Sequence, residues 1–297
     1  MVCTNTNPKL MTMFTPLMLA LAVTVPTSTS LCFAGDLPGS EEIIAKMIDA
    51  GGGAAAMRKI KNRVMKMTMD FGMGGMTGKG VVHYARPGNQ HTVIEIQGMG
   101  TIEEGVTDGV AWALAVMTGP QIKEGGERGI ALLEADLDGL LNWKSHFKKI
   151  ECVSKETLDG KEYFKVELTP HEGSMITTYV DTTTYLTYRS DLKLSTAMGE
   201  FDMIIYSEDY RPVDGVQYSH KSRVEIMGQK RVVTIESIEH NVEMPKDIFK
   251  LPDEIKALVA KSKEQENKEE KTKEEKGKQR EDEKKVKSSL EGSKNED

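Results

Sequence analysis

Cysteine is scarce in this sequence and occurs only at Cys3, Cys32 and Cys152. The first two lie in residues 1–34, a segment that we expect to be removed, so Cys152 alone remains in the expected mature chain. A single cysteine excludes an internal disulfide and a metal site built on several cysteines. The mature chain must therefore be held together by packing, and we expect Cys152 to be a small buried apolar residue.

Motifs that support catalysis are also missing. None of the six histidines has a second His or Cys at a metal-ligand spacing, and the HExxH, G-x-S-x-G and GxxxxGK[ST] motifs do not occur. The glycine-rich run Gly72–Gly80 joins two expected strands, so it lacks the helix N-terminus that would bind phosphate. We predict no enzyme, no metal and no cofactor. An enzyme stays an alternative, because catalytic residues can meet only in the fold.

Long apolar runs are limited to Met13–Val25. This stretch contains Pro16 and is too short to cross a membrane comfortably. With Lys9 before it and Cys32-Phe33-Ala34 after it, the segment is typical of a cleavable signal peptide covering residues 1–34. We predict export to the periplasm. A membrane anchor is one alternative, and lipidation of Cys32 is another, although Leu31 stands where a small residue would be expected.

The C-terminal 37 residues, 261–297, contain 12 basic and 12 acidic residues, and their apolar side chains are Val286 and Leu290. Such a segment cannot bury enough apolar surface to offset its ordering entropy. We predict a disordered tail, part of which can form a solvated helix through Glu–Lys pairs. Because the charges cancel locally, we expect no nucleic acid as a partner.

The body between these segments, residues 36–260, favours strands. Alternating apolar residues and turn pairs such as Asp108-Gly109 and Asp159-Gly160 predict about eleven strands joined by short connections, and hence an antiparallel sheet. Apolar stripes predict a helix capped by Ser40 and a second helix at 128–143. We expect an α+β fold with a strongly curved sheet, a half-barrel, whose concave apolar face is covered by a few helices.

Methionine is the positive signal. Met65, Met67, Met69 and Phe71 would line one face of one expected strand. Flexible thioether chains suit surfaces that must fit variable apolar partners, so these residues are candidates for a lipid-binding cavity. Ordinary core filling is the alternative.

Three short phrases resemble the periplasmic outer-membrane lipoprotein-sorting carriers, the LolA-like proteins. The first is Gly78-x-Gly80 with Tyr84-Ala85-Arg86-Pro87-Gly88-Asn89. The second is Val106-Thr107-Asp108-Gly109 with Trp112, and the third is Asp247-Ile248-Phe249-Lys250-Leu251-Pro252. Their order along the chain is that of the family.

This resemblance implies a non-enzymatic carrier of lipid or lipoprotein acyl chains in a hydrophobic cavity, with a membrane-bound donor or acceptor protein as a partner. We add Trp112 to the expected cavity residues. The family also implies that Arg86 acts as a latch on a helical lid, because a guanidinium can bind several carbonyls at once.

Two features depart from the family: the long strand pairs of residues 181–239 and the charged tail. These departures leave the identity of the substrate undecided, but the expectation of a lipid-binding scaffold is unchanged. An envelope sensor or interaction protein that uses the same scaffold is the alternative function.

Overall fold

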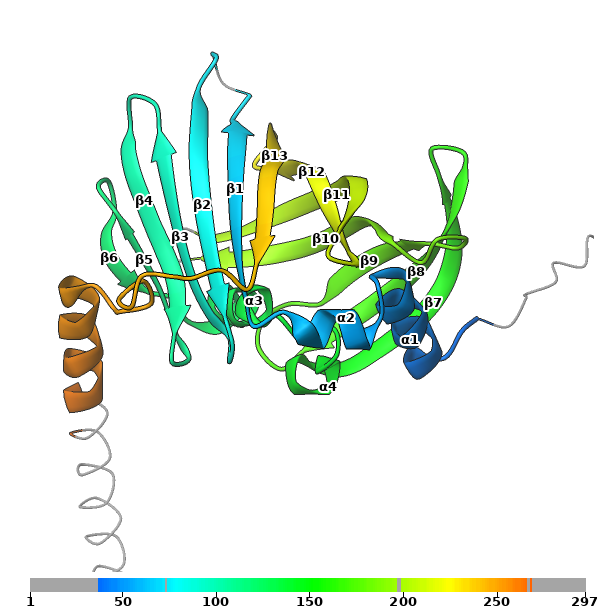
Figure 1. Ribbon diagram of the computed structural model, residues 1–297, viewed down its shortest axis with the longest axis horizontal. Coiled ribbons are helices and arrows are strands. Elements are labelled where there is room, and N and C mark those ends of the chain that lie inside the picture. The colour runs from blue at the N-terminus through cyan, green and yellow to red at the C-terminus, as the bar shows by residue number, and fades with distance from the viewer. Residues whose placement is uncertain (1–36, 73, 197–198, 266–267, 269–297) are drawn as a thin grey trace, which may run out of the picture. The chain divides into compact units, whose positions relative to one another are not determined.

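The structure is a computed structural model that describes residues 37–72, 74–196, 199–265 and 268. The predicted signal peptide and nearly all of the predicted tail lie outside these residues. The described chain forms a single antiparallel sheet of thirteen strands with four labelled helices (Figure 1). The predicted α+β fold with a strongly curved antiparallel sheet is confirmed.

The strands follow one another as hairpins. In chain order they are β1 (Asn62–Asp70), β2 (Thr77–Ala85), β3 (Asn89–Ile96), β4 (Gly100–Thr107), β5 (Val110–Ala115), β6 (Gly119–Ile122), β7 (Phe147–Leu158), β8 (Lys161–Pro170), β9 (Ile176–Asp181), β10 (Thr187–Thr196), β11 (Gly199–Val213), β12 (Val216–Ile226) and β13 (Gln229–His240). In the sheet, β6 and β7 form the two edges, and β1 pairs with β13 in the middle.

Turn chemistry explains the hairpins. Asp108 and Gly109 have φ angles of 49° and 78°, and Asp159 and Gly160 have 50° and 78°. These left-handed conformations match the twist of the flanking strands. The two hairpins predicted at these pairs are therefore confirmed. The sheet has thirteen strands where about eleven were predicted. One strand that the sequence did not indicate is β6, a short edge strand that contains Pro120, and a proline is tolerated in a sheet at an edge.

The labelled helices are α1 (Ser40–Ala50), α2 (Ala54–Lys59), α3 (Gly125–Ala135) and α4 (Trp143–His146). Two sequence predictions are corrected here. The residue before α1 is Gly39, and the Ser40 hydroxyl donates to the Ile150 carbonyl of β7 at 2.5 Å and does not cap the helix. The helix predicted over 128–143 ends at Ala135, because the Asp136 carboxylate accepts the N–H of Asp138 and forms a turn there.

Helices cover one face of the sheet, which we call the inner face. Ile43 and Ile44 of α1 pack with Val166 of β8 and Val180 of β9 in the main core. In a second cluster, Ala131 and Ala135 of α3 pack against Val106 of β4 and Ala111 of β5. Helix α3 thus contacts β4 and β5, and it also contacts β10. The curled sheet in Figure 1 brings these distant strands to one helix.

After β13 the chain runs past the strands of the first half to a C-terminal helix at residues 253–265, drawn in orange in Figure 1. The Thr107 hydroxyl donates to the Phe249 carbonyl at 2.9 Å, and Ile255 is fully buried. The boundary predicted at residue 260 falls inside this helix, so residues 261–265 are helical. The state of the other tail residues stays a prediction.

Candidate ligand cavity

A cavity of about 340 Å³ lies between the inner face of β7–β11 and helices α1, α3 and α4. This volume is in the range of small-molecule sites. Most of the lining is aliphatic, and it includes Ile44, Met47, Ile130, Leu133, Ile150, Val166, Ile176, Val180, Leu192 and Ile205. Two polar side chains of the lining, Thr178 and Ser190, form a hydrogen bond with each other, with their hydroxyl oxygens 3.2 Å apart. The cavity is therefore suited to an apolar chain.

Two charged residues line the cavity, and they differ in their partners. Asp136 is paired with His146, whose Nε2 lies 2.8 Å from its Oδ2. Glu134 of α3 forms no ion pair with any residue that the structure describes. Glu134 is exposed to solvent. Desolvation raises its pKa to about 7, repulsion by Glu104 adds to this, and attraction to Lys123 opposes it.

Met65, Met67 and Met69, which we call the methionine ladder, lie on the inner face but outside the lining of this cavity. Arg63 of β1 pairs with Tyr84 of β2, Tyr84 pairs with Gln90 of β3, and Gln90 pairs with Val106 of β4. Residues paired in this way share a face of the sheet, and Val106 packs on α3. By strand alternation, Met65, Met67 and Met69 face the same way. All three are half-buried, and Met67 lies over Gly80, where a Cβ would stand 2.7 Å from its Cε. The ladder is thus part of the inner face in the other half of the sheet.

Phe71 follows the end of β1 and is nearly buried. Its ring approaches Gly78 of β2, where a Cβ would lie 3.2 Å away, and the Arg231 guanidinium stands 5.6 Å from the ring centroid. Phe71 therefore accompanies the ladder, and like the ladder it does not line the cavity. Whether these four residues touch a ligand stays a prediction.

Trp112 does not line this cavity, and whether it touches a ligand stays a prediction. Ala111 packs on α3, so its neighbour Trp112 points to the opposite, outer face. There its ring stacks on His91, with centroids 5.8 Å apart, and His91 stacks on His83 at 6.4 Å. Trp112 is 1% exposed, which makes it a core residue of the outer face.

Arg86 stands where the latch was predicted, at the end of β2. Its Nε donates to the Ile60 carbonyl at 2.7 Å, and its Nη2 donates to the Met57 carbonyl of α2 at 3.1 Å. Its Nη1 forms an ion pair with Asp138, in the segment between α3 and α4. One guanidinium therefore ties the sheet to two segments on its helical side. The role of this contact as a latch stays a prediction.

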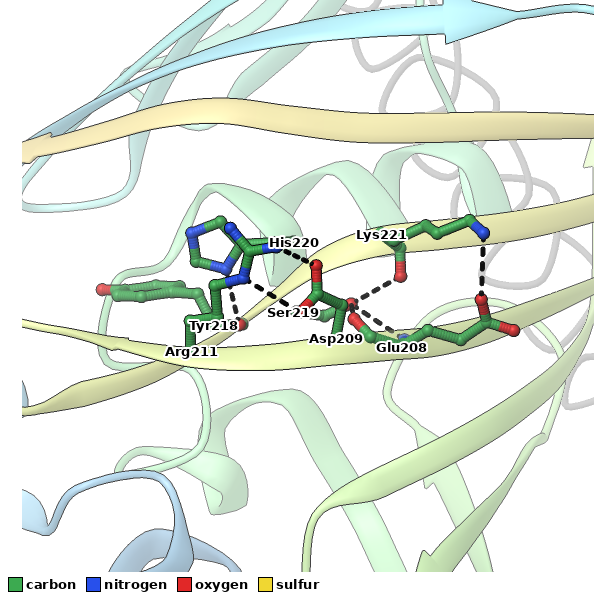
Figure 2. Close-up of polar contacts among 7 residues, drawn as sticks. All are labelled: Glu208, Asp209, Arg211, Tyr218, Ser219, His220 and Lys221. Carbon is green, nitrogen blue, oxygen red and sulfur yellow. Dashed lines mark hydrogen bonds and ion pairs between the residues drawn. The ribbon is translucent and has the colours of Figure 1, made fainter.

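A serine, a histidine and an aspartate meet in the β11–β12 pair, as Figure 2 shows, but their contacts do not favour catalysis. The Ser219 hydroxyl donates to the Glu208 carbonyl at 2.9 Å, and Asp209 accepts both Nε and Nη2 of Arg211. The His220 ring contacts a carbonyl of its own strand, two residues earlier, at 3.1 Å. The hydroxyl and the carboxylate are thus engaged elsewhere, and no base faces the serine in this cluster.

Two further findings concern the described residues alone. They contain no group of three or more His, Cys, Asp or Glu side chains able to hold a metal ion. Within the same residues, no helix has the length and apolar character needed to span a membrane.

Several solved structures are similar to this protein. No family model and no curated protein matches the sequence. A DUF1329 family protein from Desulfovibrio piger is 13% identical, with a TM-score of 0.48, over 71% of this chain and 96% of that one.

A Vibrio parahaemolyticus domain described as an outer membrane lipoprotein-sorting protein is 9% identical, with a TM-score of 0.47, over 70% and 95% of the two chains. A LolA superfamily protein from Nitrosomonas europaea is 12% identical, with a TM-score of 0.45, over 69% and 96%.

Proposed function

We propose that the protein is an exported, non-enzymatic carrier that binds an acyl chain of a lipid or lipoprotein in the cavity between β7–β11 and helices α1, α3 and α4. The observation that carries this proposal is the aliphatic lining of a hollow of about 340 Å³ on the helix-covered face of the sheet. An elongated apolar ligand is the chemistry that such a surface recognises.

The energetics support an acyl chain. Each buried methylene contributes about 0.8 kcal/mol, so a dozen contribute roughly 10 kcal/mol before the cost of immobilising the ligand. Such a chain can be held without a covalent bond and released when the cavity opens. We expect opening to require movement of the α3–α4 segment, which lines the cavity and which Arg86 holds through Asp138.

The test is a matched pair of substitutions in β11. Ile205 lines the cavity, whereas its neighbour Ile204 does not. We expect Ile205→Phe to fill the cavity and to weaken binding of a fluorescent long-chain fatty alcohol at least tenfold, and we expect Ile204→Phe to leave it unchanged. Titration by fluorescence measures both. Equal affinity in the two variants would place the ligand elsewhere and contradict the proposal.

A further inference from the structure

Large apolar side chains are exposed along one edge of the sheet. They lie in the turns that join β3 to β4, β5 to β6, and β12 to β13. They are Met99, 42% exposed, Val116, 80%, Met117, 76%, and Met227, 64%. Because neighbouring strands are antiparallel, these turns and the β1–β2 turn fall on the same edge, at the upper ends of β1–β6 in Figure 1. We call these four residues the apolar rim.

The turns of this edge are neighbours across the sheet. Gly72, in the β1–β2 turn, lies directly against the Lys230 backbone, just after the β12–β13 turn. On the other side, the Gln97 N–H of the β3–β4 turn donates to the carbonyl of the first residue of β2 at 3.0 Å. A Cβ on Gly100 would stand 3.5 Å from Cγ2 of Val116 in the β5–β6 turn. The four turns therefore form one continuous edge.

The rim differs in chemistry from the opposite edge of the same strands. Its three turns contain no charged residue. The turns at the opposite edge contain Arg86, Asp108 and Asp214, and in the described chain none of the exposed large apolar side chains lies in them. Asp-Gly pairs form hairpin turns well, so turn formation alone does not explain methionine and valine at the rim. A row of exposed apolar residues along one edge is typical of an interaction surface.

The size and form of the rim favour a lipid bilayer over a protein as its partner. A stable protein interface uses about 20–30 residues a side, whereas the rim presents four apolar side chains on three separate turns. A membrane interface accepts separate side chains, because it needs no complementary shape and its affinity grows with the apolar area buried. Flexible methionine side chains suit such a variable partner. The uncharged turns can also enter the interface without burying a charge.

We infer that the apolar rim docks the protein on the surface of a lipid bilayer, where Val116 and Met117, the most exposed of the four, enter the interfacial region. Lys230, two residues after the β12–β13 turn, is already paired with Glu225, with its Nζ 3.4 Å from Oε1. Docking should therefore depend little on anionic lipid. It does not require a ligand in the cavity between β7–β11 and the helices.

Vesicle flotation tests the docking, with phosphatidylcholine vesicles and with vesicles that also contain phosphatidylglycerol. We expect the full-length protein to bind both, and Met117→Gln to lower the partition coefficient about tenfold, because a polar amide replaces a thioether that the bilayer buries. Met117→Leu keeps an apolar side chain and should retain binding. Any contribution of residues 1–34 is common to all variants, so the comparison isolates the rim.

Met175→Gln is the matched control. Met175 is 48% exposed, but it lies in the β8–β9 loop, which the Glu172–Arg128 ion pair ties to α3, and not in the rim. This variant should bind vesicles as the wild type does. Thermal unfolding should give the same midpoint for both glutamine variants, because both residues are exposed in loops.

Several results would contradict docking at the rim. They are absence of wild-type binding to phosphatidylcholine vesicles, equal binding of Met117→Gln and wild type, and an equal loss in Met175→Gln. A dimer that Met117→Gln dissociates in analytical ultracentrifugation, without vesicle binding, would instead make the rim an interface between copies of the chain. The fluorescent alcohol titration of Ile205→Phe is carried out without vesicles, so the cavity proposal can stand when docking fails, and the reverse.

Discussion

The two halves of the inner face differ in how they are covered. In the half formed by β7–β11, helix α1 and the α3–α4 region pack on the sheet, and residues such as Val166 and Val180 are 1% and 0% exposed. In the half formed by β1–β6, the Met65–Met69 ladder is half-buried, and the charged residues Arg63, Glu104 and Lys123 lie nearby. One sheet thus provides a packed apolar hollow and, beside it, a looser surface with charge.

Under the proposed function, the apolar half would supply most of the binding energy, because it would remove the ligand's methylenes from water. Helix α3 contacts both halves and contributes Glu134 at their boundary.

The strongest test of the difference compares one residue from each half. Ile43 of α1 is fully buried in the core, so Ile43→Ala should lower the free energy of unfolding by about 3 kcal/mol. Met67 is half-buried over Gly80, and Met67→Ala should cost roughly 1 kcal/mol. Urea unfolding of the two variants measures both values. Equal losses would show that the two halves are packed alike.

A smaller effect is expected at the contact that joins the sheet to its helical cover. Arg86→Leu removes two hydrogen bonds to carbonyls and leaves Asp138 without its cation, so we expect a loss of about 2 kcal/mol. Hydrogen exchange should accelerate in residues 54–60, and release of a bound fluorescent lipid should become faster. Lys59→Leu, at an exposed residue of α2, is the control. Unaltered exchange and release in Arg86→Leu would exclude a latch.

The smallest expected effect on stability concerns Glu134, at the boundary between the two halves. Because the pKa of Glu134 is raised from 4.5 to about 7, the folded state holds a proton that the unfolded state releases at lower pH. The ligand-free protein should therefore lose stability as the pH rises from about 4.5 to 7. Glu134→Gln should remove this loss and raise stability at pH 8 by about 1 kcal/mol, since water in the cavity screens the charge.

Thermal unfolding at pH 5 and pH 8 tests this pH dependence, with Glu124→Gln as the control. A Glu134→Gln variant that keeps the pH dependence of the wild type would contradict the raised pKa.

Much of the fold follows from local patterns. Asp-Gly pairs identify hairpins because their left-handed conformations are set by two residues, and strand alternation identifies which residues share a face. Arg86 was found through a phrase of family resemblance, and its contacts with two carbonyls agree with the expected chemistry. These features depend on short stretches of sequence.

The location of the cavity could not be found in this way. The face on which each strand meets a helix depends on contacts between distant residues, so the sequence did not show that Trp112 and the methionines lie outside the lining of this cavity. The sequence did contain a pattern that could have identified Glu134 as a cavity residue. It lies four residues after Ile130 and beside Leu133, within an apolar helical stripe that a carboxylate interrupts.

The pairing of β1 with β13 has a consequence for synthesis of the chain. Each half of the sheet is a run of local hairpins, and β1–β13 is the seam at which residues about 170 positions apart must meet, as Met65 meets Ile238. A nascent chain that has reached Ile122 already has every strand that carries Arg63 and the methionines, but no apolar hollow. The hollow is lined by residues of β7 to β11, so a chain that ends at Ile122 lacks the cavity in which the proposed function places an acyl chain.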